Sequence, residues 1–231
     1  MTNVSNDPET DAGWEALLFD LDGTLADSVG LILHCYRHTM RTHLGHEPAD
    51  ELWLAGMGTP LMVQLEAFAR SAHELLAMQD TYRSFQRTVH DDMVRPYPGA
   101  SETLEDLAGR GVRLGVVTSK HREMTLRTLR VCGLVDHFDV IITPEDVTRG
   151  KPDPEPVLVA LERLGDLHPR RVLFVGDAPV DVHAGRAAGV RTAGALWGPF
   201  GHEVLREAGA DYLLHALADV LTLRPNGDGQ G

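Results

Sequence analysis

Apolar residues along this chain follow two different patterns, and the change between them divides the sequence. Residues 15–20, EALLFD, form a short continuous apolar run typical of a strand buried on both faces. From about Ser28 to Arg95 the apolar residues recur at helical spacing, and no strand pattern interrupts them. The segment 95–100, RPYPGA, then supplies two prolines and a glycine, which predicts a domain boundary at this point.

After this boundary, short apolar runs alternate with amphipathic segments. The predicted strands are 112–119, 138–143, 171–177, 190–198 and 210–214. The predicted helices are 101–111, 122–133, 153–165, 179–189 and 201–209, with a last helix before the tail RPNGDGQG. Regular strand–helix alternation predicts an α/β fold with a parallel sheet that helices cover on both faces.

The two patterns together predict one domain interrupted by another. We expect a core domain made of residues 14–27 and 96–224, with an all-helical segment, 28–95, inserted into it directly after the first strand. Polar, acidic or glycine-rich ends predict disordered tails at 1–13 and 225–231. The inserted segment is expected to lie above the carboxyl edge of the sheet as a lid.

Charge and composition narrow the possible partners. The 231 residues are 43% hydrophobic, enough for a buried core, and carry a formal net charge of −13. That sign argues against binding to nucleic acid or to anionic membrane surfaces, although one basic pocket can still receive a small anion. Two cysteines without metal-ligand spacing, no signal peptide and no apolar run of about 18 residues predict a cytoplasmic protein with free thiols.

Polar side chains follow several of the predicted strands directly. Because the carboxyl ends of parallel strands meet at one edge of the sheet, where ligands bind in such folds, we expect these side chains to lie together. They are Asp20 with Asp22, Thr118 with Ser119, Lys151 in the loop before the third helix, and Asp177 with Asp181.

Four carboxylates in one place would repel each other, and a hard divalent cation resolves this repulsion. Mg²⁺ prefers oxygen ligands and usually keeps waters and substrate phosphate in its shell. The sequence therefore predicts a Mg²⁺ site with Asp20 and Asp177 as carboxylate ligands and a backbone carbonyl from Leu21–Asp22. Asp181 either contacts the metal or complements the first turn of a helix.

The other strand-end residues suit a phosphoryl group. Lys151, one of only two lysines in the chain, supplies a point positive charge, Thr118 a hydroxyl and Ser119 a backbone amide. Metal, ammonium, hydroxyl and amide provide the charge neutralisation and positioning that phosphoryl transfer requires.

The paired acids of the first strand then take different roles. Asp20 is predicted to attack phosphorus and form an acyl phosphate. Asp22 is predicted to protonate the leaving oxygen and then to accept a proton from the hydrolytic water. Gly23 permits an unusual backbone turn behind them. We expect Asp27 and Ser28 to cap the first helix of the inserted segment.

Four motifs carry a resemblance to a known family. The stretches DLDGTLADS, VVTSK, GKPDP and VGDAPVDVHAGRAAG, in this order, resemble the motifs of the haloacid dehalogenase-like hydrolase superfamily. The likeness extends over residues 15–222 and is greatest to phosphoglycolate phosphatase-like members with a helical cap. It implies a Rossmann-like core and a cap that closes over substrate.

The resemblance also implies roles for the site residues. It makes Asp20 the nucleophile and Asp22 the acid/base, places Thr118 and Lys151 on the phosphoryl group, and places Asp177 on Mg²⁺ with Asp181 in or beside the metal shell. The implied activity is a Mg²⁺-dependent phosphatase acting on a small phosphorylated, phosphoglycolate-like metabolite, as a monomer or homodimer.

Several alternatives stay open. Dehalogenase members lack an acid at the position of Asp22, and Schiff-base hydrolases use a cap lysine that residues 28–95 do not contain, so both are disfavoured. A phosphosugar mutase, a pyrophosphatase and a non-enzymatic binding protein on the same fold remain. A mutase needs a cap group for a distal phosphate; Arg37, Arg41, Arg70, Arg83 and Arg87 are available, and their spacing selects none of them. The loop 55–60 is either a helix–helix turn or a loop that reaches the substrate.

Overall fold

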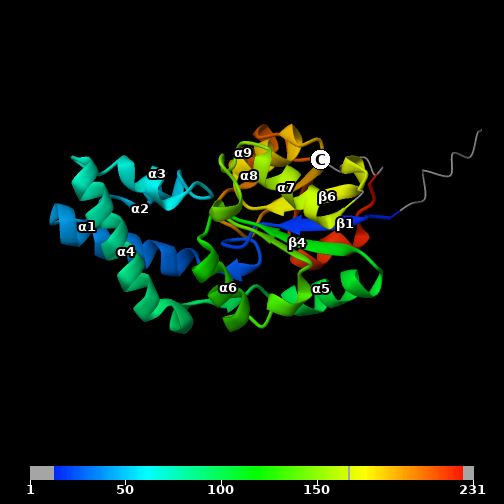
Figure 1. Ribbon diagram of the computed structural model, residues 1–231, viewed down its shortest axis with the longest axis horizontal. Helices are drawn as coiled ribbons and strands as arrows, with labels where there is room; N and C mark the ends of the chain where they lie inside the picture. The colour runs from blue at the N-terminus through cyan, green and yellow to red at the C-terminus, as the bar shows by residue number, and fades with distance from the viewer. Residues whose placement is uncertain (1–12, 166, 226–231) are drawn as a thin grey trace, which may run out of the picture.

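A computed structural model describes residues 13–165 and 167–225 of the chain. Six parallel strands form one sheet in the order β5-β4-β1-β6-β7-β8 (Figure 1). Their bounds are β1 Ala16–Phe19, β4 Arg113–Val117, β5 Val140–Ile142, β6 Val172–Gly176, β7 Arg191–Ala195 and β8 Tyr212–Leu214. The first strand lies in the middle of the sheet, so the residues that follow it enter the centre of the carboxyl edge.

Helices cover both faces of this sheet, as the strand–helix alternation predicts. The helices of this part of the chain are α5 Ala100–Gly109, α6 Arg122–Val131, α7 Glu155–Leu164, α8 Pro179–Ala187 and α9 His202–Glu207. Leu17 and Phe19 of β1 pack in one hydrophobic cluster with residues of α5 and α6, whereas Leu18 packs in a second cluster with residues of α7 and α8. Successive residues of a strand point to opposite faces, so a continuous apolar run such as ALLF supplies both clusters.

The segment 28–95, called the cap here, consists mainly of helices joined by loops, and Figure 1 shows it beside the sheet. Its helices are α1 Val29–Leu44, α2 Asp50–Leu54, α3 Leu61–Glu66 and α4 Ala72–Met93. An aromatic group holds them together: Trp53 stacks on Tyr36 with ring centroids 4.7 Å apart and on Tyr82 at 5.9 Å. The large apolar residues of the cap pack on one another, and they belong to the same hydrophobic cluster as Leu17 and Phe19 of the sheet.

Two short strands connect the cap with the sheet domain. Strands β2, Ala26–Asp27, and β3, Arg95–Pro96, pair antiparallel at the two points where the chain enters and leaves the cap. Two residues per strand give too short an alternation to predict from sequence. The division into core and cap at residues 27/28 and 95/96 stays a prediction, and this strand pair lies at both of its boundaries.

Other expectations about the chain have mixed outcomes. The predicted last helix is present as a 3₁₀ helix, η5, Leu217–Thr222. This helix has only six residues, and the Asp219 carboxylate accepts from the backbone N–H of Ala216 at its start. Such short helices are typical of 3₁₀ geometry. Apart from Gly13 and Pro225, the predicted disordered tails lie outside the described residues. Within the described residues, no helix is both long and apolar enough to cross a membrane.

Candidate active site

Two neighbouring strands place their terminal acids side by side. Asp20 follows β1 and Asp177 follows β6, and these strands pair in register with Phe19 opposite Val175. The backbone N–H of Asp20 donates to the carbonyl of Val175 at 2.9 Å, so the ladder extends to the acid itself. The parallel register thus fixes the separation of the two carboxylates.

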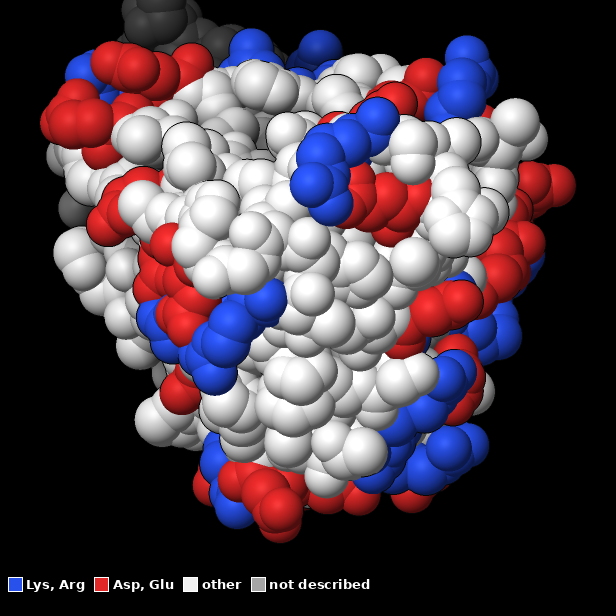
Figure 2. Space-filling view, turned by 90° about the vertical axis from the view of Figure 1, so that its left-hand side faces the viewer, with Lys and Arg blue, Asp and Glu red and all other residues white. Residues whose placement is uncertain are grey.

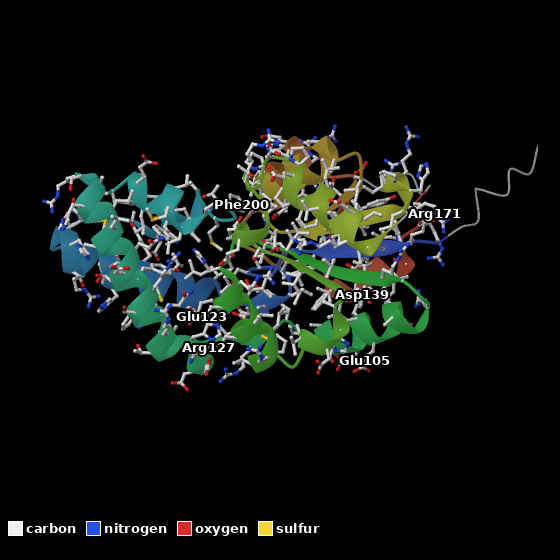
Figure 3. All side chains as sticks on the ribbon, viewed as in Figure 1. Glu105, Glu123, Arg127, Asp139, Arg171 and Phe200 are labelled. Atoms are coloured by element: carbon white, nitrogen blue, oxygen red, sulfur yellow. The ribbon has the colours of Figure 1, made fainter. Side chains whose placement is uncertain are left out.

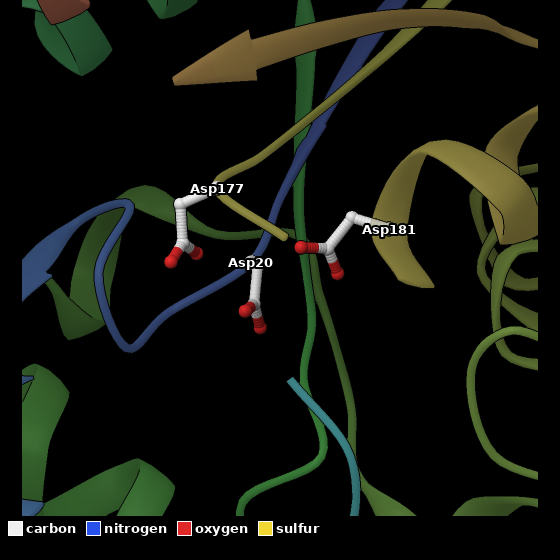
Figure 4. A group of neighbouring side chains, drawn as sticks. All are labelled: Asp20, Asp177 and Asp181. Atoms are coloured by element: carbon white, nitrogen blue, oxygen red, sulfur yellow. The ribbon is translucent and has the colours of Figure 1, made fainter. Parts of the chain in front are cut away.

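Three buried carboxylates meet at this edge of the sheet. Asp20, Asp177 and Asp181 each offer an oxygen that lies within 4.8 Å of the others, and Figure 4 shows the three carboxyl groups around one space. Asp181 comes from the first turn of α8, where its Oδ2 also accepts from the backbone N–H of Ala178 at 3.0 Å. Asp181 therefore complements a helix start and belongs to the acidic cluster as well.

Among the described residues, Lys151 is the one cation buried within this acidic cluster. Its Nζ lies 3.0 Å from Asp20 Oδ1 and donates to Asp181 Oδ1 at 2.6 Å. Burial alone would lower the pKa of Lys151, but the carboxylates of Asp181 and Asp20 together raise it above its usual value. The lysine therefore stays charged and holds two of the three acids.

One ammonium does not balance three buried carboxylates. Burial raises the pKa of Asp20 to about 6, because Lys151 only partly offsets the loss of hydration. Burial, followed by repulsion from Asp181 and Asp20, raises the pKa of Asp177 well above its usual value. A second cation restores the ionised form, and a set of carboxylate oxygens is the donor set that Mg²⁺ prefers. The described residues therefore fit a divalent cation.

The backbone behind the acidic cluster requires glycine. Gly23 has φ +80°, and a Cβ built there would lie 2.4 Å from Asp177 Oδ2. Thr24 follows, and its hydroxyl donates to Asp177 Oδ1 at 2.9 Å. Trp197 donates from Nε1 to the Thr24 carbonyl at 3.0 Å and so supports the same turn. Gly23 and Thr24 of the first motif therefore hold Asp177 in position at the carboxyl edge of the sheet.

Asp22 lies apart from the acidic cluster and has its own partners. Its Oδ1 accepts from Lys120 Nζ and from Ser28 Oγ, both at 2.6 Å. Sequence reasoning missed Lys120, although it was one of only two lysines and stood inside the VVTSK motif. Ser28 occupies the N-cap position of α1 without a side-chain capping bond, so the expected capping was wrong and the hydroxyl instead orients Asp22.

Thr118 and Ser119 stand between the sheet and the cap. The N–H of Thr118 donates to the Ile142 carbonyl at 3.0 Å, and its hydroxyl accepts from the N–H of Lys120 at 3.2 Å. Ser119 was expected to offer its amide; its hydroxyl donates to the carbonyl of Gly58 in the cap at 2.6 Å.

The cap loop 55–60 touches the core at the site. Gly58 has φ +87°, and a Cβ there would lie 2.6 Å from Val180 Cγ2 and 2.9 Å from Ala178 Cβ. The loop therefore packs on the first turn of α8, beside Asp181. Of the two sequence interpretations, the geometry favours a loop that reaches the site.

A cavity between core and cap connects these groups. Asp20, Asp22, Thr118, Ser119 and Lys120 line its core side. Its cap side is lined by residues of α1 to α4 and the intervening loop, among them Trp53, Gly58, Gln64, Tyr82, Arg83, Gln86 and Arg87. Chemistry at the sheet edge would thus take place against a wall supplied by the cap.

A comparison with known families now gives the site a context. The profile described as haloacid dehalogenase-like hydrolase matches residues 17–195, well over half of the chain. The chain belongs to this family. The resemblance that the four motifs carry is therefore confirmed, and so is the prediction of a hydrolase enzyme.

Individual relatives agree with this assignment. The pyrophosphatase PpaX of Bacillus velezensis is 39% identical over 213 residues, which cover 92% of this chain and 97% of that protein. A crystal structure of a Bacteroides fragilis protein, assigned as a haloacid dehalogenase-like hydrolase, superposes with a TM-score of 0.83 at 31% identity, covering 90% of this chain and 99% of that one. A Lactobacillus plantarum structure assigned as a phosphoglycolate phosphatase gives 0.80 at 27%, covering 91% and 99%. The predicted α/β fold is confirmed.

Proposed function

We propose that this enzyme is a Mg²⁺-dependent phosphatase that hydrolyses a small phosphorylated metabolite through an aspartyl-phosphate at Asp20. One observation carries the proposal: Asp20, Asp177 and Asp181 converge with the ammonium of Lys151 in a buried group at the carboxyl edge of the sheet. Buried like charges of this kind cost stability, which a charged ligand offsets.

Asp20 acts as the nucleophile. Its carboxylate lies at the end of β1 on the cavity, where it attacks phosphorus and displaces the leaving oxygen. Lys151, 3.0 Å from Asp20 Oδ1, holds the carboxylate and offsets negative charge on the phosphoryl oxygens. The hydroxyl of Thr118 and the amide of Ser119 supply neutral donors on the same wall of the cavity.

Asp22 acts as the acid and then the base. It lines the same cavity two residues from Asp20, and Lys120 and Ser28 fix its carboxyl from the side. It gives a proton to the leaving oxygen as the phosphoenzyme forms, and it takes a proton from the water that hydrolyses the acyl phosphate. The enzyme returns to its starting state with one phosphate released.

Mg²⁺ would be held by Asp20, Asp177 and the backbone carbonyl at Leu21–Asp22, with Asp181 beside them. When bound, the ion neutralises charge between the nucleophile and the phosphoryl group and orients both. Thr24 and Gly23 keep Asp177 aimed at that position.

The relatives suggest which substrates to test first. Proteins named pyrophosphatase PpaX support inorganic diphosphate, and the neighbour assigned as a phosphoglycolate phosphatase supports phosphoglycolate. A phosphosugar mutase stays an alternative, and it predicts activation by a bisphosphate. A cytoplasmic location and a monomeric or homodimeric state stay predictions from the sequence.

The test compares Asp20→Asn with wild type and with Asp80→Asn, which changes an exposed acid of α4. We expect phosphate release from diphosphate, phosphoglycolate and p-nitrophenyl phosphate to need Mg²⁺ and to fall by at least about 10³-fold in Asp20→Asn only. Fluoroaluminate trapping followed by mass spectrometry identifies the reacting carboxylate. Robust turnover in Asp20→Asn would refute the mechanism.

A further inference from the structure

The six arginines of the cap differ in their partners, and Arg95 at its end donates to the backbone carbonyls of Asp91 and Val94. Four of them form ion pairs: Arg37 with Asp50, Arg41 with Glu47, Arg70 with Glu74, and Arg87 with Glu123. On the end of the molecule in Figure 2, basic side chains accordingly lie against acidic ones. Their charges are compensated within the protein.

Arg83 is the exception. It lies on α4, is partly buried and lines the cavity that also holds Asp20 and Asp22. Within the described part of the chain it has no ion pair and no hydrogen bond, whereas Arg87, one turn further on, is held by Glu123 of α6 at 2.9 Å. Glu123 faces the cap from α6 in Figure 3. The charges of Arg87 and Glu123 cancel each other, so the charge of Arg83 gives the cap side of the cavity a net positive charge.

A guanidinium is always charged and only donates hydrogen bonds, so Arg83 favours an anionic acceptor from outside the chain in this cavity.

Lys120 does not compete for this role. It lines the cavity too, but its ammonium is committed to Asp22 at 2.6 Å. By the proposed function, the reacting phosphoryl group lies at Asp20 on the core side of the cavity. The guanidinium of Arg83 lies on the cap side, where it is available to a different part of the same molecule.

We propose that Arg83 forms a second-anion subsite that selects substrates carrying another oxyanion beside the reacting phosphate. Inorganic diphosphate and phosphorylated carboxylic acids have such a group, and phosphate monoesters of neutral alcohols do not. This inference rests on the proposed function for the position of the reacting phosphate, and it adds the residue and the charge that discriminate among substrates.

The test measures binding, so that it does not depend on turnover. In the Asp20→Asn background with Mg²⁺, calorimetry compares phosphoglycolate with ethylene glycol monophosphate, which replaces the carboxylate by CH₂OH. A hydrogen bond to a charged group is worth about 1.5–3 kcal/mol, so we expect phosphoglycolate to bind roughly 10- to 100-fold more tightly. Diphosphate is expected to bind at least as tightly as phosphoglycolate.

Variants then assign the discrimination. Asp20→Asn with Arg83→Gln is expected to lose most of the phosphoglycolate preference, and Arg83→Lys to keep part of it. Arg37→Gln, which breaks a compensated pair outside the cavity lining, is the matched control and should keep the full preference. Equal affinity for the two ligands in the Asp20→Asn protein, or a preference that survives Arg83→Gln, would overturn the inference whatever the enzyme hydrolyses. A failure of the proposed function appears separately, as absent phosphate release by wild type.

Discussion

At the residue scale, the site depends on a glycine that takes no part in the chemistry. Gly23 holds φ +80° while Asp177 occupies the space where its side chain would be. Gly45, the residue that ends α1, has nearly the same φ, +77°, and nothing within 4 Å of its Cβ position. The two glycines therefore separate the cost of the backbone conformation from the cost of displacing an acid.

We predict different outcomes for Gly23→Ala and Gly45→Ala. A left-handed conformation costs a non-glycine residue about 1–3 kcal/mol, so both variants should melt at a lower temperature than wild type. Only Gly23→Ala should also raise the Mg²⁺ concentration for half-maximal activity, by about 10- to 100-fold, because it moves Asp177. Thermal melts and Mg²⁺ titrations of phosphate release measure the two effects. Equal Mg²⁺ requirements in both variants would contradict this role of Gly23.

Single residues also mark the limit of sequence reasoning. The paired acids of the first motif are predictable as site residues, because two carboxylates at the end of one buried strand repel each other unless a ligand compensates their charge. The contact of Lys120 with Asp22 is not predictable from the sequence, because it joins residues 98 positions apart. Arg83 likewise resembles the other cap arginines in sequence. It differs from Arg37, Arg41, Arg70 and Arg87 only in the ion pairs that those four form.

At the element scale, the cap meets the core on two sides. Helix α4 is fixed to α6 by His90, which is buried and contacts Thr128 Oγ1 at 2.8 Å, and by Asp91, which accepts from Arg127 at 2.8 Å. The opposite contact is a loop, in which Gly58 accepts from Ser119. Helices α4 and α6 share several side-chain contacts, whereas among the described residues one side-chain hydrogen bond joins the loop to the core. We therefore expect the cap to separate from the core more easily on the side of the loop.

Ser119→Ala tests the loop contact. A neutral hydrogen bond contributes about 0.5–1.5 kcal/mol, so its loss should reduce the closed population and raise KM by roughly 2- to 10-fold. The amide of residue 119 is retained, and the effect should therefore fall on KM more than on kcat. Steady-state kinetics with diphosphate measure it, with Ser101→Ala, a serine whose hydroxyl contacts exposed Glu105, as the control. A fall in kcat at unchanged KM would assign Ser119 to the chemistry instead.

Element order and type are the part of this fold that the sequence predicts well. Strands β1, β5, β6 and β8 are short apolar runs with an acid directly before or after them, so their pattern can be recognised without knowledge of the tertiary structure. The β2–β3 pair and the 3₁₀ form of Leu217–Thr222 are fixed by contacts distant in sequence or by a few local hydrogen bonds. Periodicity does not report either kind of interaction.

At the scale of the whole molecule, the buried acids store an electrostatic cost that a cation removes. In the metal-free folded state the pKa of Asp20 is raised from 3.8 to about 6, and that of Asp177 is raised as well. The folded state then binds more protons than the unfolded state between these values, so this group lowers stability as pH rises from about 4 to 6. Above pH 6 the contribution of Asp20 to this cost is present unless a divalent ion offsets it.

The melting temperature of the variant Asp177→Asn measures this electrostatic cost. In EDTA at pH 7 the variant should melt above wild type, because it removes one of three mutually repelling carboxylates while the amide oxygen still accepts from Thr24. Its advantage should shrink towards pH 5, where the wild-type cluster takes up protons. The difference between the two proteins cancels the opposing contribution of His90, whose pKa burial lowers and which destabilises the fold on acidification in both.

Mg²⁺ should reverse the order of the two proteins. Ligand at 100 times its dissociation constant stabilises the state that binds it by about 2.7 kcal/mol, so wild type should gain several degrees and Asp177→Asn little. Melting curves at pH 5 and 7, in EDTA and in Mg²⁺, give the four comparisons, with Asp80→Asn as a variant that changes an exposed acid. A wild type that melts above Asp177→Asn in EDTA at pH 7 would show that the acidic cluster is compensated within the chain, because no bound cation would then be needed to offset it.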